Sequence, residues 1–172
     1  MANQTLISDS LHETILILDF GSQYTQLIAR RIRELGVFSE IQPFNYNLNE
    51  IKKKNIKGLI LSGSPSSVYA EDAPRIGKEI FDLKLPVLGI CYGLQLITSL
   101  RNGDVGKAEK KEYGLANLHI NHAGSLFDGI PQVTRVWMSH GDRINRLPEF
   151  FKASAHTENS PFAAIYHEHE PI

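Results

Sequence analysis

The stretch of sequence that decides the fold covers residues 86–97 and reads PVLGICYGLQLI. Its first half is a short apolar run that predicts a buried strand, and its second half predicts an apolar helix. Between them lies Gly89-Ile90-Cys91-Tyr92-Gly93, centred on the single cysteine of the chain. Glycines two residues before and after a nucleophile are typical of a sharp, strained nucleophile elbow. We therefore expect Cys91 to be exposed at a helix start, where the helix dipole favours the thiolate, whereas a small buried core residue is the alternative interpretation.

The N-terminal half alternates short apolar runs with helical patterns. Strands are expected near residues 14–19, 37–41, 58–62 and 86–90, with helices near 24–35 and 48–54. Ser22 is the expected N-cap of the first helix, and Gly36 its end. This order predicts an α/β fold with an open, mostly parallel, flavodoxin-like sheet that carries helices on both faces.

The pattern changes after residue 100. Turn signals such as Asn102-Gly103 and Asp128-Gly129 separate short alternating runs. These runs predict antiparallel strands appended to the edge of the sheet, near residues 118–120, 133–137, 150–155 and 163–166. Five aromatic residues are expected to pack in the core: Tyr24, Phe38, Phe44, Phe81 and Trp137.

Length and composition limit the classes of protein to consider. The chain has 172 residues, 42% of them hydrophobic, and a net charge of −1. That is enough for one domain, expected over residues 14–172 after a tail at 1–13. The absence of a long basic run speaks against nucleic acid or an anionic membrane as partner, and the longest apolar runs are strand-sized. One cysteine and a polar start favour a cytoplasmic protein.

Functional groups collect at the carboxyl ends of the expected parallel strands. Residues 19–23 follow the first strand, residues 62–67 follow the third, and Cys91 follows the fourth. Backbone N–H groups of Ser64 or Gly63, with that of Tyr92, could form an oxyanion hole beside the thiolate. An ordinary β–α turn is the alternative interpretation of the glycine-serine loop.

Five motifs occur in order along the chain: Asp19-Phe20-Gly21-Ser22-Gln23-Tyr24, Leu61-Ser62-Gly63-Ser64-Pro65, Gly89-Ile90-Cys91-Tyr92-Gly93-Leu94-Gln95, Lys111-Glu112-Tyr113-Gly114 and Trp137-Met138-Ser139-His140-Gly141-Asp142. From Thr14 to the last residue, the chain resembles the class I glutamine amidotransferase domain of GMP synthetases. The resemblance implies a glutaminase in which Cys91 attacks the side-chain amide of glutamine and water later releases glutamate from a thioester. By position, the glutamine-binding residues would be Gly63, Gln95, Ser139 and His140.

The same resemblance implies the partners of the domain. The ammonia would pass to an ATP-using synthetase domain that converts xanthosine monophosphate to GMP. No cofactor and no metal is expected in the glutaminase domain itself, whereas ATP and Mg²⁺ are expected for the synthetase domain. The full-length enzyme would be a homodimer.

The base and its orienting carboxylate are not apparent in the sequence. In the resembled family they come from a His-Pro-Glu motif, and the chain contains neither this motif nor the Ser-Gly-Gly-x-Asp-Ser loop of the ATP-using domain. We therefore expect an N-terminal piece of a longer enzyme, incomplete at its C-terminus and with little turnover alone. His156 and Glu158 are an internal alternative for the base. The segment His167-Glu168-His169-Glu170 is either a metal site or base, or a charged hairpin tip.

Other functions remain open from the sequence. The domain could belong to another class I amidotransferase, or to a peptidase-like or chaperone-like hydrolase that shares the cysteine elbow. It could also be a non-catalytic glutamine-binding or docking module. The arginines of the first helix, Arg30, Arg31 and Arg33, are either a solvated helix face or a surface that docks the synthetase domain.

Overall fold

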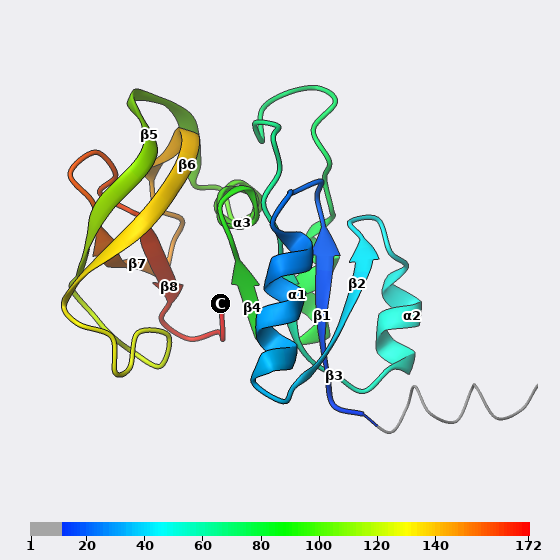
Figure 1. Cartoon of the computed structure of the whole chain (residues 1–172). Helices are drawn as coiled ribbons and strands as arrows, with labels where there is room; N and C mark the ends of the chain where they lie inside the picture. The colour runs from blue at the N-terminus through cyan, green and yellow to red at the C-terminus, as the bar shows by residue number, and fades with distance from the viewer. Residues whose placement is uncertain (1–11) are drawn as a thin grey trace, which may run out of the picture. The chain divides into compact units, whose positions relative to one another are not determined.

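The structure is a computed structural model that describes residues 12–172, apart from the side chains at positions 109 and 111. It divides into two compact units, Met1–Leu96 and Ile97–Ile172, and the boundary falls within a helix. Each unit has a sheet of its own (Figure 1).

The first unit is built on a four-stranded sheet in the order β2-β1-β3-β4. All three strand pairs are parallel, as the sequence predicts. The strands are β1 (Thr14–Asp19), β2 (Phe38–Pro43), β3 (Ile56–Leu61) and β4 (Val87–Gly89). Because all four strands run the same way, their carboxyl ends share one edge of the sheet.

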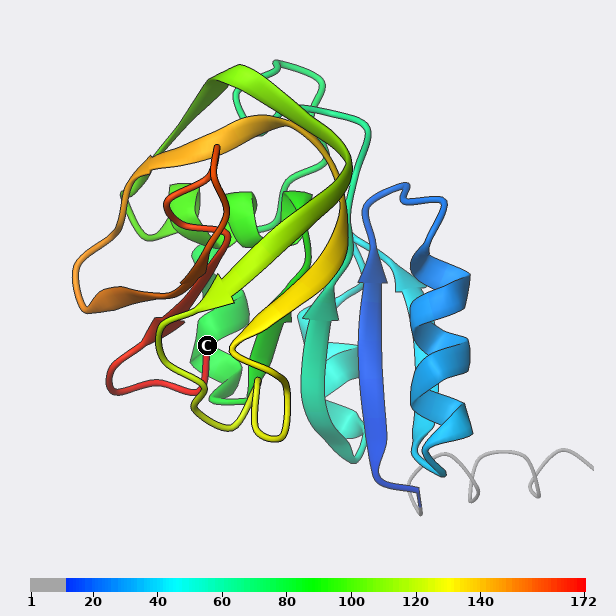
Figure 2. The ribbon, with the colours of Figure 1, turned by 60° about the vertical axis from the view of Figure 1, so that its left-hand side comes forward.

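Helices connect these strands or follow the last of them, and they cover both faces of the sheet, as predicted. They are α1 (Thr25–Glu34), α2 (Leu48–Lys53), the 3-10 helix η1 (Lys78–Leu83) and α3 (Tyr92–Leu100). Figures 1 and 2 together show α1 and α2 on opposite faces. Ile17 and Ile60 pack against Ala29 of α1, whereas the alternate residues Leu16 and Leu59 are buried on the other face.

The start of α1 differs from the sequence prediction. Tyr24, and not Ser22, is the N-cap residue, and no side chain caps the helix there. The Ser22 hydroxyl instead accepts a hydrogen bond from the Tyr24 N–H at 3.1 Å, in a turn that precedes the helix. The predicted end is correct: Gly36 follows the helix with φ +78°, a conformation that favours glycine.

The basic face of α1 makes local contacts. Arg30 and Arg31 donate to the carboxylate of Glu34 at 3.0 and 2.7 Å, on an exposed face of the helix. Exposed pairs of this kind contribute at most about 1 kcal/mol. These contacts favour the solvated-face interpretation, and a docking role for the arginines stays a prediction.

The second unit contains an antiparallel sheet in the order β6-β5-β7-β8. Its strands are β5 (Asp104–Ile120), β6 (Val133–Arg146), β7 (Phe151–His156) and β8 (Ala164–His167). The predicted antiparallel strands are therefore present, but they form a sheet of their own. Both β5 and β6 are much longer than the apolar runs that predicted them. In β5, charged residues between 107 and 112 interrupt the apolar alternation.

The core of the second unit contains Leu118, Ile120 and Ala155. The prediction of core packing was wrong for three aromatic residues, because Tyr24, Phe38 and, on β6, Trp137 are exposed, Trp137 to 69%. Phe81 of the first unit is buried, as expected. Among the described residues, no helix has both the length and the apolar composition needed to cross a membrane.

Candidate active site

Cys91 occupies the sharp turn between β4 and α3. Its φ of +53° lies in the left-handed region that L residues other than glycine rarely adopt. A Cβ on Gly93 would lie 2.1 Å from the carbonyl oxygen of Leu61, and one on Gly89 would lie 2.6 Å from the backbone nitrogen of Leu94. Both glycines are therefore required by the close approach of backbone to backbone, and the turn has the strained geometry of a nucleophile elbow.

The side chain of Cys91 is exposed at the start of α3. Its carbonyl oxygen accepts the N–H of Gln95 at 3.1 Å, so Cys91 directly precedes the helix. The N–H groups of a first helical turn have no partner within the helix and carry its partial positive charge. This position favours a negative charge on the sulfur.

The loop after β3 lies beside the nucleophile. A Cβ built on Gly63 would lie 3.7 Å from the Cβ of Cys91 and 3.3 Å from the hydroxyl oxygen of Ser22. The buried Ser62 hydroxyl accepts the N–H of Phe20 at 3.0 Å and so ties this loop to the end of β1. The structure thus brings together the carboxyl ends of β1, β3 and β4, as the sequence predicts.

A serine at position 64 fits the loop after β3 only if its φ is not in the left-handed region. The described non-glycine residues with positive φ are Lys84, Cys91, Asn102 and Phe150, so Ser64 is not in the left-handed region. Its hydroxyl oxygen accepts the N–H of Ser66 at 3.2 Å within the loop. A serine is therefore accommodated at this position without backbone strain.

Tyr92 is the first residue of α3, and its side chain is held in place by burial and a hydrogen bond. Its side chain is fully buried, and its hydroxyl donates to the carbonyl oxygen of Pro74 at 2.6 Å. Burial raises the pKa of Tyr92, which keeps the hydroxyl protonated as a donor, although Arg75 nearby acts in the opposite direction. The N–H of Tyr92 is the expected oxyanion donor. It belongs to a residue whose backbone begins α3 and whose hydroxyl is hydrogen-bonded.

The residues expected to bind glutamine fall in both units. Gln95 is buried, one helical turn after Cys91 on α3. Ser139 and His140 lie on β6 of the second unit, where Ser139 is exposed and His140 is partly buried. Adjacent residues of a strand point to opposite faces, so these two side chains do not point the same way.

His140 faces Glu112, which the sequence singles out only as part of the Lys111-Glu112-Tyr113-Gly114 motif. Its Nε2 lies 3.3 Å from Oε2 of Glu112, directly across the β5–β6 ladder. The other oxygen, Oε1, accepts the hydroxyl of Thr157 at 2.6 Å. Because Glu112 stands in a run of charged residues, the sequence suggests that it is exposed to solvent. The structure shows that its side chain is buried, opposite His140 in the strand ladder.

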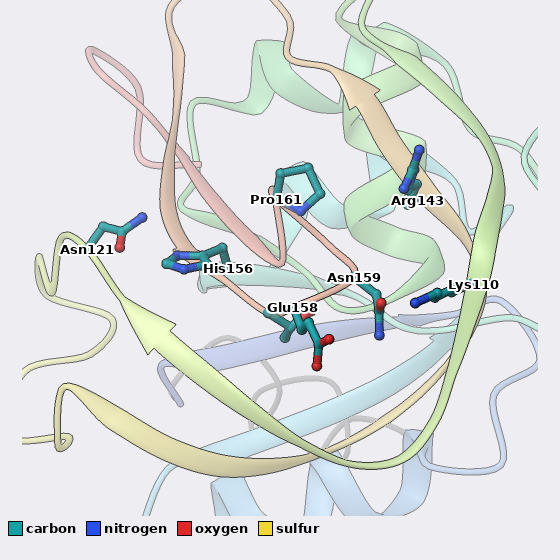
Figure 3. A pocket seen from close by; sticks show the side chains of 8 residues that line it. Lys110, Asn121, Arg143, His156, Glu158, Asn159 and Pro161 are labelled. Carbon is teal, nitrogen blue, oxygen red and sulfur yellow. The ribbon is translucent and has the colours of Figure 1, made fainter.

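His156 and Glu158 line a pocket of about 430 Å³ in the second unit. Figure 3 shows Lys110 and Arg143 on one side of it and His156 on the other. The His156 ring also stacks on His119, with ring centroids 5.2 Å apart. These contacts give His156 a packing role within its own unit, and its use as a base stays a prediction.

The turn after β8 accounts for His167. Its Nδ1 accepts the N–H groups of His169 and Glu170 at 3.1 and 2.9 Å, so this nitrogen serves the turn. Burial lowers the pKa of His167. Within the described part of the chain, no cluster of three or more histidine, cysteine or acidic side chains could hold a metal ion. In the described residues this charged segment is therefore a turn that follows β8, and the contacts do not support the metal-site interpretation.

Known proteins of one family match the chain. The family model for glutamine amidotransferase class-I matches residues 16–172. A glutamine-hydrolysing GMP synthase of Wolinella succinogenes is 53% identical over 96% of this chain and 33% of its own length. Another, from Caldanaerobacter subterraneus, is 58% identical over 89% of this chain and 30% of its own length. The chain thus spans about a third of the length of these relatives.

Solved structures agree in fold. A protein from Thermoplasma acidophilum, provisionally described as one of the subunits of a GMP synthase, has a TM-score of 0.82 at 32% identity and covers 94% of this chain and 81% of its own. A glutamine amidotransferase from Thermotoga maritima has a TM-score of 0.72 at 19% identity, over 91% of this chain and 72% of its own, and so shows the fold alone. The chain belongs to the class I glutamine amidotransferase family and, within it, matches the glutaminase domain of GMP synthases.

Proposed function

We propose that Cys91 is the nucleophile of a glutaminase. The thiolate adds to the side-chain amide carbon of glutamine and forms a carbon–sulfur bond. The carbon–nitrogen bond then breaks, and the nitrogen takes up a proton and leaves as ammonia. Water cleaves the resulting thioester, which releases glutamate and restores the thiol. The observation that carries the proposal is the left-handed backbone of Cys91 between two glycines that have no room for a side chain.

The negative charge of the tetrahedral intermediate needs donors beside the sulfur. We propose that the N–H groups of Ser64 and Tyr92 supply them, because one belongs to the loop beside Cys91 and the other to the first residue of α3. Fixed backbone donors stabilise such an oxyanion without reorganising during the reaction. Gly63 supports this role, since its missing side chain leaves space next to the cysteine.

By resemblance to the family, the residues that hold the glutamine would be Gly63, Gln95, Ser139 and His140. Buried Gln95 is suited to reading a polar ligand, because its amide both donates and accepts hydrogen bonds. In the full-length protein we propose that the ammonia aminates xanthosine monophosphate to GMP in an ATP- and Mg²⁺-dependent synthetase domain, within a homodimer. The relatives' name, glutamine-hydrolysing GMP synthase, supports this assignment.

Protection of Cys91 by its substrate tests the proposal. A small thiol reagent such as iodoacetamide should label Cys91, and glutamine should slow the labelling, whereas asparagine, with its amide one carbon shorter, should not. Replacing Gln95 by alanine should raise the glutamine concentration for half-protection about tenfold, since one lost hydrogen bond to a ligand is worth on the order of 1–3 kcal/mol.

The matched control is Gln132→Ala, which removes the same side chain from an exposed position. This variant should be protected like the unmodified chain, and both variants should unfold at a similar denaturant concentration. If glutamine at any concentration leaves the labelling rate of the unmodified chain unchanged, Cys91 does not lie in a glutamine site and the proposed function is wrong.

A further inference from the structure

Three side chains, two of them buried and one partly buried, form a connected group in the second unit. They are Glu112 of β5, His140 of β6 and Thr157, which follows β7. The side chain of Glu112 is 5% exposed and that of His140 is 16% exposed. Thr157 in turn accepts the N–H of Ser160 at 3.0 Å. The carboxylate of Glu112 therefore links the middle of β6 to the loop between β7 and β8.

The two contacts of Glu112 differ in kind. The bond from the Thr157 hydroxyl is short and directed, at 2.6 Å. His140 lies at ion-pair distance, 3.3 Å, without the alignment of a hydrogen bond, and its Nδ1 has no hydrogen-bond partner. Burying a carboxylate costs free energy because it loses its hydrogen bonds to water. Thr157 and His140 are the neighbours that compensate Glu112 for this loss.

The register of the β5–β6 ladder shifts next to this group. Lys107 pairs with Asp142, the next pair is Glu112 with His140, and the register shifts between them. Residues 108–111 of β5 therefore stand opposite Gly141 of β6, and the ladder is irregular at this point. The Glu112–His140 pair stands directly after this shift in register.

The alternation of β6 turns this contact into a positioning device. Because His140 points inward to Glu112, its neighbour Ser139 is directed to the exposed face. A strand that slips or twists by one residue exchanges these two faces. An anchor on His140 therefore fixes which of the two side chains is presented to a ligand.

We propose that Glu112 is a positioning residue for glutamine binding: it holds the imidazole of His140 on the inner face, with Thr157 as its second support, and thereby presents Ser139. This inference rests on the proposed function, since it assumes that the Ser139-His140 segment binds glutamine. Glu112 acts through β6 and does not itself touch the substrate.

The test uses the full polypeptide that carries this sequence. Glu112→Gln keeps the shape of the side chain but weakens its hold on both partners, and Thr157→Val removes the hydroxyl. Each should raise the glutamine concentration for half-protection of Cys91 about tenfold, and the KM for glutamine by a similar factor with kcat nearly unchanged. Thr157→Ser, which retains a hydroxyl, should restore binding. Labelling of Cys91 without glutamine should stay the same in all three variants.

The control is Glu168→Gln, which alters a carboxylate that pairs with Lys152 in the same unit and should leave binding unchanged. Glutamine protection at the original concentration in both Glu112→Gln and Thr157→Val would overturn the inference while leaving the proposed function standing. A parallel loss of folding stability, ligand-free labelling and kcat would also overturn it, since that result indicates a structural role only. Absence of protection in the unmodified protein would instead refute the proposed function, and this inference with it.

Discussion

Gly93 is the residue at which the backbone around Cys91 is most crowded. We predict that Gly93→Ala destabilises the protein by about 3 kcal/mol or more, because the new Cβ would lie 2.1 Å from the carbonyl oxygen of Leu61. That oxygen belongs to β3, so relief of the clash requires movement of the sheet. Chemical denaturation measures the loss.

Gly106→Ala is the matched control for this prediction. Its Cβ would lie 2.8 Å from the side-chain nitrogen of Asn145, which can move. We expect a loss of less than about 1 kcal/mol there. If the two variants were equally stable, the steric explanation of the turn at Cys91 would be incorrect.

The hydroxyl of Tyr92, the residue after Cys91, provides a second test of what stabilises the turn. We predict that Tyr92→Phe costs about 1 kcal/mol, because the hydroxyl bond to the carbonyl oxygen of Pro74 is lost inside the protein. The aromatic ring, which packs against Phe20, remains. Thermal or urea unfolding measures this loss, and an unchanged midpoint would show that the bond contributes nothing net.

At the scale of elements, the turn after β8 should make stability depend on pH through His167. Burial lowers the pKa of His167, the positive charge of Arg101 adds to this effect, and Glu170 opposes it. Since the unfolded chain binds the proton more readily, the contribution of His167 is complete above its ordinary pKa of 6.5 and declines as the pH falls below that value. The limiting slope for one proton is about 1.4 kcal/mol per pH unit.

The measurement compares urea unfolding at pH 7.5 and 5.5. His167→Asn keeps an acceptor for the N–H groups of His169 and Glu170 but does not titrate in this range. The variant should therefore lose less stability on acidification than the unmodified chain. An equal loss in both proteins would assign the pH dependence to other groups.

The elements that the sequence predicts best are those with a clear apolar period. The strand at Thr14–Asp19 agrees with the prediction at both ends, and α2 begins at the predicted residue. Strand β5 was predicted only near Leu118, because its polar residues pair through backbone groups that leave no hydrophobic pattern. The N-cap of α1 was misplaced for a similar reason, since the hydroxyl of Ser22 serves a turn and not the helix.

The residues of the candidate site also divide into those that the sequence predicts and one that it does not. Cys91, Gly63 and Ser64 were predicted, since strand ends of a parallel sheet converge by topology. Glu112 was not predicted, because its partners His140 and Thr157 are 28 and 45 residues away in the sequence, and no local pattern joins them. Long-range pairs of this kind depend on strand register, which a single sequence does not determine.

For the whole molecule, we predict little glutamine turnover by the 172-residue chain alone. Addition of a segment with the His-Pro-Glu motif of the GMP synthetase family after Ile172 should raise turnover about 10²–10⁴-fold, the usual contribution of a general acid–base group. Glutamate release measures the rate. Equal turnover with and without the segment would indicate that the base lies within the 172 residues. His156→Gln would then be the first variant to test.

The activation of Cys91 is the central claim, and its reaction with a glutamine analogue that carries a diazoketone in place of the side-chain amide tests it most directly. We predict that the analogue labels Cys91 of the folded chain faster than that of the urea-unfolded chain, and that Cys91→Ser prevents labelling. Mass spectrometry of the Cys91 peptide gives both rates. Equal rates in folded and unfolded protein would contradict the claim that the elbow activates this cysteine.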